Sequence, residues 1–364
     1  MKIKSFKAKN FRNIEECDIS FSDGVNLLYG KNAEGKTNVL EGIYLFSRGK
    51  SFRARDDSEM IRFTSEGFNA FLEYESSIGK ETLEYSVFGK EKQRKKNGYK
   101  VSKITDFVGS LKSVLFEPDN LNLVKGAPEE RRSFLNVAIS QCEPLYIRYY
   151  QGYKKALENR SCALKFIQKG MPVEREELLA WSKTLSEYAS LIYLLREEYI
   201  EKLKYYSKKF SLDISKGREK IEISHECDIE SGLRDKDLIR EKYERIFSEN
   251  IEREIAQGTT LFGPHRDDFK IKINGKDSRL YASQGQQRSI VLSLKLSEGE
   301  IIKEIFGEYP VFLLDDVLSE LDSDRRKYLL DTRGEKQIII TSCESEELKK
   351  FAENIIEVSG GKYS

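Results

Sequence analysis

The order of apolar and polar positions predicts short buried strands at both ends of the chain. Mostly apolar runs stand at residues 24–29 and at residues 338–342, which end in two hydroxyl residues, and a continuous apolar run stands at residues 309–314. A run that is apolar throughout is typical of a strand covered on both faces in a parallel sheet. The first run is followed by apolar residues at helical spacing: Val39, Leu40, Ile43 and Phe46. We therefore expect a strand, a loop and a helix near the start of the chain, and two strands of the same sheet near its end.

The pattern changes between these ends. Residues 68–74 and 82–88 alternate between apolar and polar, which indicates antiparallel strands. Residues 146–167 and 176–209 are rich in charge and carry apolar stripes, which indicates two long helices. The middle of the chain is therefore expected to be largely helical.

A hairpin is predicted after the helical region. Asn274-Gly275 is a strong signal for a tight turn, here between strands at residues 269–273 and 279–281. The predicted fold class is α/β, with mixed β-sheets and helices. One domain is built from both chain ends, residues 1–118 and 258–364, and residues 119–257 form an inserted helical domain.

A phosphate-binding loop lies between the first strand and the first helix. Its residues fit the pattern G-x-x-x-x-G-K-[ST]: Gly30, Lys31, Asn32, Ala33, Glu34, Gly35, Lys36 and Thr37. Glycines allow backbone N–H groups to surround phosphates, and the helix N-terminus adds partial positive charge. We expect Lys36 to face solvent in the empty loop and to reach the β- and γ-phosphates of ATP, and the Thr37 hydroxyl to bind Mg²⁺.

Two acidic residues follow the apolar run near the C-terminus. Asp315 and Asp316 would stand at the carboxyl end of a buried strand, where open α/β sheets bind their ligands. Asp315 is the candidate Mg²⁺ ligand, and Asp316 is the candidate catalytic residue that polarises the attacking water. The alternative for Asp316 is a cap of the next element.

A second candidate phosphate contact lies at residues 281–288. Ser283 can cap a helix that begins there, and Gly285 lets a phosphate approach the backbone. The first loop already surrounds the nucleotide of its own chain. The segment would therefore contact phosphate if it closed on a nucleotide held by another copy of the chain. An ordinary capped helix is the alternative.

Together these motifs resemble the ATP-binding-cassette ATPases of the SMC type, in which two heads enclose two ATP molecules. Residues 283–287 resemble their signature motif and residues 319–322 their D-loop, and Thr341 stands where many cassette proteins place a switch histidine. The resemblance implies an ABC-type ATPase head. It also implies further nucleotide contacts: Arg12, Asn13, Asn38, Ser283, Gly285, Gln286, Asp322 and Thr341.

The chain also resembles the bacterial RecF family along nearly its whole length. The residues that carry this resemblance are 9–13, 118–128, 131–136 and 263–268. Two departures from the cassette pattern stand out. There is no obvious Q-loop glutamine, and Glu117 lies where one would be sought. Asp316 replaces the usual longer Glu, so slow hydrolysis is expected.

Composition limits where nucleic acid can bind. The chain has 364 residues, 34% of them charged, but its net charge is only +1. Affinity for DNA must therefore come from a local basic patch. One candidate surrounds the predicted turn at Asn97-Gly98: Lys92, Arg94, Lys95 and Lys96. Another is the aromatic and basic segment 146–155, whose tyrosines are expected to pack inward. Solvated surfaces are the alternative for both.

The remaining chemistry is sparse. Five scattered cysteines are expected to be free buried thiols in a reducing cytosol, and two histidines are too few for the usual zinc site. There is no signal peptide and no apolar run of about 20 residues, so we expect a cytoplasmic protein. His265, within residues 263–268, fits a catalytic cluster or a local turn equally well.

The sequence therefore predicts an ATP-dependent homodimer that binds DNA and hydrolyses ATP slowly. The RecF resemblance implies gapped DNA or single-strand/double-strand junctions, loading of recombinase with RecO and RecR, and links to replication and the SOS response. One rival is the ATPase subunit of an ABC transporter, which shares the cassette motifs. Another is a metabolic kinase or hydrolase, in which residues 283–287 have no use.

Overall fold

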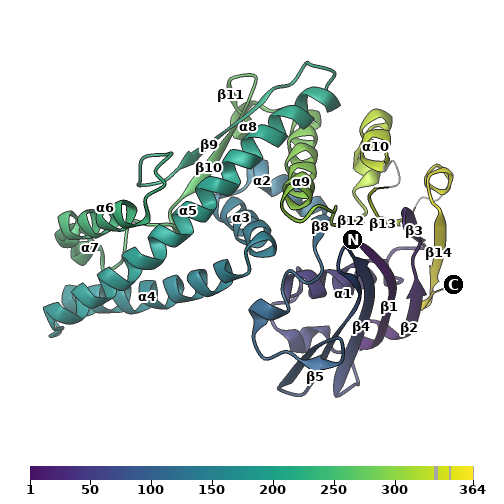
Figure 1. Ribbon diagram of the computed structural model, residues 1–364, viewed down its shortest axis with the longest axis horizontal. Helices are drawn as coiled ribbons and strands as arrows, with labels where there is room; N and C mark the ends of the chain where they lie inside the picture. The colour runs from purple at the N-terminus through teal and green to yellow at the C-terminus, as the bar shows by residue number, and fades with distance from the viewer. Residues whose placement is uncertain (332–334, 344–345, 364) are drawn as a thin grey trace. The chain divides into compact units, whose positions relative to one another are not determined.

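The computed structural model describes residues 1–331, 335–343 and 346–363. The chain divides into two compact units, whose elements are labelled in Figure 1. Unit 1 comprises Met1–Val124, Tyr206–Lys220 and Ser283–Ser364, and unit 2 comprises Lys125–Tyr205 and Ile221–Ala282. These bounds differ from the predicted ones. Residues 119–124 and 206–220 belong with the chain ends, and residues 258–282 belong with the helical middle.

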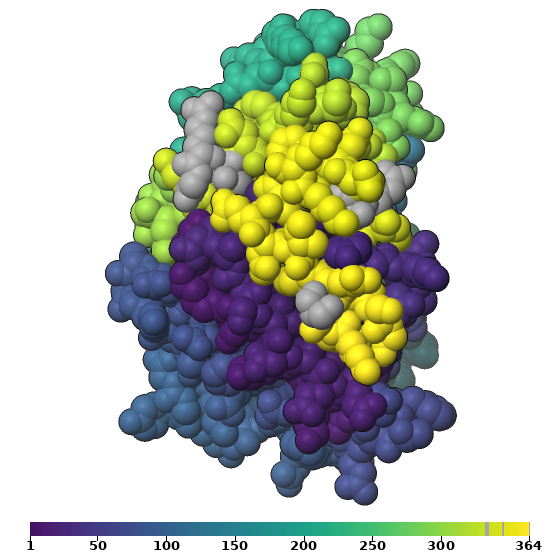
Figure 2. Space-filling view, turned by 90° about the vertical axis from the view of Figure 1, so that its right-hand side faces the viewer, coloured from purple at the N-terminus to yellow at the C-terminus, as the bar shows by residue number. Residues whose placement is uncertain are grey.

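The parallel sheet of unit 1 is assembled from both chain ends, as predicted. Its strand order is β15-β14-β3-β13-β12-β8, and only the β14–β15 pair is antiparallel. The strands are β3 (Val25–Tyr29), β8 (Ser113–Phe116), β12 (Val311–Asp315), β13 (Ile338–Ser342), β14 (Asn354–Ser359) and β15 (Lys362–Tyr363). Figure 2 shows the C-terminal residues, in yellow, lying against the N-terminal residues, in purple.

An antiparallel sheet with the order β2-β1-β4-β5-β6-β7 completes the strands of unit 1. These strands are β1 (Lys2–Phe11), β2 (Ile14–Ser20), β4 (Gly67–Ser76), β5 (Gly79–Phe88), β6 (Glu91–Lys96) and β7 (Tyr99–Lys100). The predicted strands at 68–74 and 82–88 are confirmed as β4 and β5. The turn between β6 and β7 has φ values of 51° at Asn97 and 78° at Gly98, as a tight hairpin requires.

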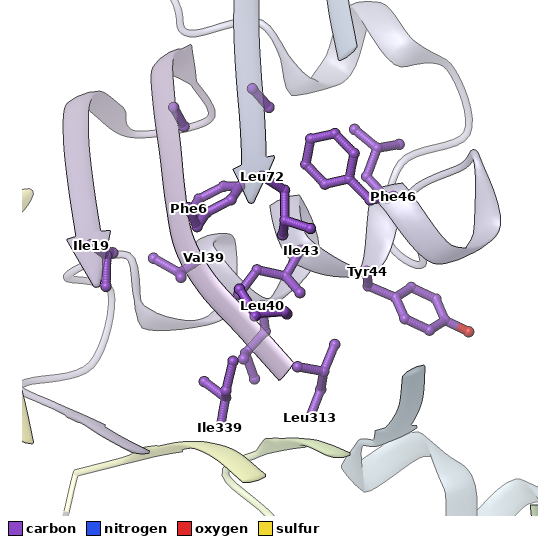
Figure 3. Close-up of a cluster of buried hydrophobic side chains, with 14 of the residues drawn as sticks. Phe6, Ile19, Val39, Leu40, Ile43, Tyr44, Phe46, Leu72, Leu313 and Ile339 are labelled. Atoms are coloured by element: carbon purple, nitrogen blue, oxygen red, sulfur yellow. The ribbon is translucent and has the colours of Figure 1, made fainter. Parts of the chain in front are cut away.

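Helix α1 (Lys36–Arg48) packs between the two sheets. Its predicted apolar face is fully buried (Figure 3), with Phe6 and Leu72 of the antiparallel sheet on one side and Leu313 and Ile339 of the parallel sheet on the other. Gly42 permits this approach, because a Cβ there would lie 2.5 Å from the Phe6 ring. The helix that follows the phosphate loop is thus also the centre of the unit's core.

The other helices of unit 1 come mainly from the C-terminal third. Ser283 caps α9 (Gln284–Phe306), as predicted, and Asp322 caps α10 (Ser323–Leu330). Short 3₁₀ turns lie at Asp57–Met60, Ile104–Asp106, Pro118–Leu121, Leu318–Glu320 and Leu348–Lys350. Helix α2 (Asn122–Lys125) lies at the end of the first segment of the unit.

Unit 2 is mostly helical and contains one small sheet, β11-β10-β9. Its elements are α3 (Pro128–Cys142), α4 (Leu145–Gln168), α5 (Arg175–Ile214, which continues into unit 1), β9 (Ile221–Glu226), α6 (Lys236–Glu249), α7 (Ile251–Gln257), β10 (Asp268–Ile273), β11 (Lys276–Asp277) and α8 (Ser278–Tyr281). The two predicted long helices are confirmed as α4 and α5.

Two expectations are wrong. The predicted strand at residues 279–281 is helical, because the Asp277 carboxylate accepts the Arg279 N–H and caps α8 directly after the turn. Among the cysteines, all of them free, only Cys17 is buried, whereas Cys162 and Cys343 are exposed. Within the described residues, no helix is long and apolar enough to cross a bilayer.

The core around α1 gives a stability prediction. Leu40 is fully buried, so Leu40→Ala should lower the free energy of unfolding by about 2–5 kcal/mol, measured by denaturant titration. Ile78 is 79% exposed, and the control Ile78→Ala should change that free energy by less than about 0.5 kcal/mol. Similar losses for the two variants would show that α1 is not the centre of the core.

Candidate nucleotide-binding site

The loop between β3 and α1 needs its glycines for close packing. A Cβ at Gly30 would lie 2.1 Å from the Val358 carbonyl oxygen. Gly35 is the N-cap of α1 with φ of 109° and ψ of 7°, where a side chain would be strained. A Cβ at Gly35 would also lie 2.8 Å from the Asn13 side-chain oxygen. The phosphate-loop pattern therefore matches a loop whose backbone geometry excludes other residues at these two positions.

Lys36 is buried at the beginning of α1, with only 7% of its surface exposed. Its Nζ donates to the carbonyl oxygens of Gly30 at 2.6 Å and Lys31 at 2.7 Å. The expectation that this side chain faces solvent is wrong. The carbonyls of the loop curl around the ammonium and leave it inside the loop, where the phosphates are expected to lie.

The carboxyl ends of the parallel strands bring the other candidate residues together. Asp315 ends β12, and its Oδ1 accepts hydrogen bonds from the Thr37 and Thr341 hydroxyls, each at 2.8 Å. Thr37 and Asp315 are 278 positions apart in the chain. Hydroxyl and carboxylate oxygens are hard metal ligands, the type that Mg²⁺ prefers together with substrate phosphates.

Asp316 follows directly and turns the chain away from the sheet. Its φ is 52°, a left-handed conformation that Asp tolerates better than most residues. Its N–H donates to the Thr341 hydroxyl at 3.1 Å, and its carbonyl accepts from Ser319 at 2.9 Å. The residue is exposed and lies next to Asp315, at the carboxyl ends of the parallel strands.

Glu117 lies at the same edge, one residue after β8. Phe116 pairs with Leu314 in the parallel register, so Glu117 stands beside Asp315 on the neighbouring strand. Burial raises the pKa of Glu117, and the carboxylates of Asp119 and Asp315 raise it further. A carboxyl group thus occupies the place where the cassette pattern has an amide, and its Oε1 accepts a hydrogen bond from the Asn120 amide at 3.3 Å.

Arg12 and Asn13 form the wall of a groove beside the phosphate loop. The Arg12 guanidinium makes a double hydrogen bond with the fully buried Glu41, at 2.6 and 3.0 Å. Asn13 accepts from the Asn38 amide at 2.6 Å and donates to the Ala33 carbonyl at 3.3 Å. The resemblance pointed to Arg12, Asn13 and Asn38. It gave no sign of Glu41, whose one sequence signal is a charge on the apolar face of α1.

The predicted signature residues form a second group at the N-terminus of α9. The Ser283 hydroxyl and the Gln286 side chain cap the first turn reciprocally. Arg325 donates to the Gly285 carbonyl at 3.4 Å, to Ser289 and to Asp322. Nothing lies within 4 Å of a Cβ built at Gly285, and its φ is not left-handed. The packing of this chain therefore gives no reason for a glycine there.

The predicted DNA-contacting residues of the β6–β7 hairpin are paired with acids of their own unit. Lys92 binds Asp57 at 2.7 Å, Lys95 binds Glu84 at 2.8 Å and Lys96 binds Glu81 at 2.9 Å. Arg94 lies over the Tyr85 ring, 4.9 Å from its centroid. The positive field of this hairpin is therefore largely compensated. In the second candidate segment, Tyr146 and Tyr153 are buried, as expected.

His265 lies in unit 2 and has a structural environment. Its Nδ1 is 2.6 Å from the hydroxyl of the buried Tyr153. Burial lowers the pKa of His265 to about 4, so the ring is neutral at pH 7. Asp268 nearby is held by Arg131 at 2.7 and 2.8 Å. These contacts favour the local turn over the catalytic cluster.

Comparisons with known proteins agree with this geometry. The family model described as "RecF/RecN/SMC N terminal domain" matches residues 2–362. The DNA replication and repair protein RecF of Clostridioides difficile (strain 630) is 41% identical over 362 residues, which cover 98% of this chain and 96% of that protein. The protein of the same name from Acetivibrio thermocellus is 37% identical, with 100% and 99% covered.

Solved structures show the same similarity. The recombination mediator protein RecF in its ATP form, described as part of the RecFOR pathway, matches with a TM-score of 0.92 and 37% identity, covering 100% of this chain and 97% of that one. The Smc head domain from Pyrococcus furiosus matches with a TM-score of 0.57 at 15% identity, which shows a shared fold only. The fold is that of an ABC-type ATPase head.

Proposed function

The chain belongs to the RecF family, and from this premise we propose that it is an ATP-dependent DNA-binding protein of recombinational DNA repair. The observation that carries the proposal is the Thr37–Asp315 hydrogen bond beside the Lys36 loop. It links the phosphate-loop pattern to the acid at the end of β12, which supports a nucleoside triphosphatase site at the carboxyl ends of the parallel strands. The RecF structure in its ATP form supports ATP as the nucleotide.

In this proposal the loop N–H groups and Lys36 hold the phosphates, and Lys36 exchanges its two carbonyl partners for phosphate oxygens. Thr37 and Asp315 would hold Mg²⁺, which neutralises charge on the β- and γ-phosphates when bound. Arg12, Asn13 and Asn38 line the groove beside the loop. Thr341 fixes both the Asp315 carboxylate and the backbone of Asp316.

Asp316 is proposed to orient the attacking water, because it is exposed at the open edge of the sheet next to Asp315. Its short side chain reaches less far than Glu would, so slow hydrolysis is expected, as in a switch rather than a metabolic enzyme. The family model of RecF, RecN and SMC proteins covers residues 2–362, and this match argues against the transporter alternative.

Two copies are proposed to close on two ATP molecules through the α9 N-terminus. Glycine is a poor helix former, and no contact among the described residues requires it at Gly285. A phosphate held by a second copy would explain the glycine, because the exposed Ser283 cap and the helix dipole favour an anion at this helix N-terminus. Gln286 and Asp322 hold the cap and the adjacent D-loop in place.

The closed dimer is proposed to bind gapped or junction DNA in the cytoplasm and to act with RecO and RecR, with links to replication and the SOS response. The relatives' description as DNA replication and repair proteins supports the DNA-related part. The compensated charges of Lys92, Lys95 and Lys96 make their hairpin a weak candidate surface, so the DNA-contacting residues remain a prediction.

Lys36→Met should reduce ATP affinity to below detection in calorimetric titration, because it removes the cation that contacts the β- and γ-phosphates. Lys50→Met, the same change at an exposed position after α1, should retain wild-type affinity. Unchanged ATP affinity in a folded Lys36→Met protein would contradict the assignment of the loop.

Asp316→Asn should retain ATP binding and slow phosphate release by about a hundredfold or more, the usual contribution of a catalytic base. Trapped dimers should then accumulate with ATP. Asp324→Asn, an exposed acid on α10, is the control and should hydrolyse at the wild-type rate. Normal turnover by Asp316→Asn, or loss of ATP binding, would show that the two acids have other roles.

DNA binding should be stronger with ATP than with ADP, insensitive to base sequence and strongly weakened by salt. Closing a dimer doubles the phosphate contacts, and each contact releases condensed counterions. The measurement is a titration of duplex and gapped DNA at two salt concentrations. Charge reversal at Lys95 and Lys96 tests the hairpin as one candidate DNA surface, and the solvated-surface alternative predicts that it leaves the affinity unchanged. Equal affinity in the two nucleotide states would refute the ATP-dependent clamp.

A further inference from the structure

An exposed phenylalanine stands at the edge of the nucleotide site. Phe63 is 92% exposed, at the tip of a turn closed by the Ser65 N–H donating to the Arg62 carbonyl at 2.9 Å. The next residue, Thr64, has φ of 85°, a conformation that usually requires glycine and is costly for a β-branched side chain. Backbone strain and an exposed aromatic ring thus occur together in this turn.

This turn is fixed relative to the phosphate loop. The Arg12 N–H donates to the Met60 carbonyl at 2.7 Å, and the Arg62 N–H donates to the Asn10 carbonyl at 2.8 Å. The residue after Arg12, Asn13, in turn contacts Ala33 inside the phosphate loop. A short chain of hydrogen bonds therefore sets the position of Phe63 against that of the phosphates.

Phe63 lines a groove together with Asn13, Asn38, Arg53 and Ile61, and the volume of this groove is about 790 Å³, within the range of roughly 300–1,000 Å³ that small-molecule sites have. Two of these residues adjoin the phosphate loop: Asn38 directly follows Thr37, and Asn13 contacts Ala33. A nucleotide with its phosphates in the loop would therefore place its nucleoside near amides, guanidinium groups, an aliphatic side chain and an aromatic ring.

A single exposed aromatic residue is common on protein surfaces. Phe63 differs because a strained turn presents it, the turn is hydrogen-bonded to the backbone of Asn10 and Arg12, and its groove includes Asn13 and Asn38, which adjoin the phosphate loop. Strained conformations of this kind concentrate at ligand contacts. We propose that Phe63 stacks on the base of the nucleotide held by the phosphate loop and gives the site a preference for purines, whose larger ring system stacks more strongly.

This proposal rests on the proposed function, because it needs a nucleotide in the loop. The test uses ADP, CDP and pyrophosphate as probes. These lack a γ-phosphate, so binding is measured without closure of the dimer. Phe63→Ala is compared with Phe63→Tyr, which retains an aromatic ring, and with Tyr99→Ala, which removes an 80% exposed aromatic of the same unit.

Phe63→Ala should weaken ADP binding about tenfold, the size expected for loss of one base–aromatic stack. It should weaken CDP binding less and leave pyrophosphate binding unchanged. Phe63→Tyr and Tyr99→Ala should bind all three probes like the wild type. The melting temperature of each variant should stay near that of the wild type, since both aromatic residues are exposed.

Unchanged ADP affinity in Phe63→Ala would overturn the proposal, as would an equal loss for pyrophosphate, which would mean that Phe63 acts on the loop. Normal ADP affinity with loss of the ATP-dependent dimer would overturn it in favour of a contact between copies. If the wild-type protein binds none of the probes, the proposed nucleotide site fails as well, which separates that result from the others.

Discussion

The structure depends on the parallel pairing of strands from opposite ends of the chain. β3 lies between β13 and β14, and β12 follows β13. Carboxyl ends of parallel strands meet at one edge, so this order alone places Gly30, Thr341 and Asp315 side by side. The phosphate loop and the acid that completes it cannot work separately, since each comes from a different end of the chain. Helix α1 fills the space between the two sheets and fixes the loop to the core.

Backbone strain and buried charge are concentrated around this edge. Among the described residues other than glycine, left-handed φ values occur near the site at Asn10, Arg12, Ala33, Thr64 and Asp316. Such conformations cost about 1–3 kcal/mol each and persist where the surrounding structure holds them.

The buried Glu41 positions a residue of the same region. Its carboxylate is fully buried and accepts two hydrogen bonds from the Arg12 guanidinium, which fixes Arg12 beside the loop.

Much of this could be predicted from sequence, because short-range signals are strong. The loop, the two acids at the end of β12, the Ser283 cap and the Asn97-Gly98 turn are all local patterns.

Contacts between residues far apart in the chain leave no local pattern in the sequence. The burial of Lys36 depends on how loop carbonyls curl, and the pairing of Lys95 and Lys96 with acids depends on strand register. Residues 206–214 continue the long helix α5, yet their contacts belong to unit 1, which periodicity cannot show. Residues 279–281 were wrongly predicted because the Asp277 cap competes with the hairpin signal.

The central claim is that ATP held at the sheet edge of one copy is completed by the α9 N-terminus of another. Light scattering of the wild-type protein with no nucleotide, with ADP and with a non-hydrolysable ATP analogue tests this most directly. The account predicts a monomer mass in the first two conditions and a dimer mass in the third. An unchanged mass in all three conditions, with analogue binding confirmed by calorimetry, would contradict it.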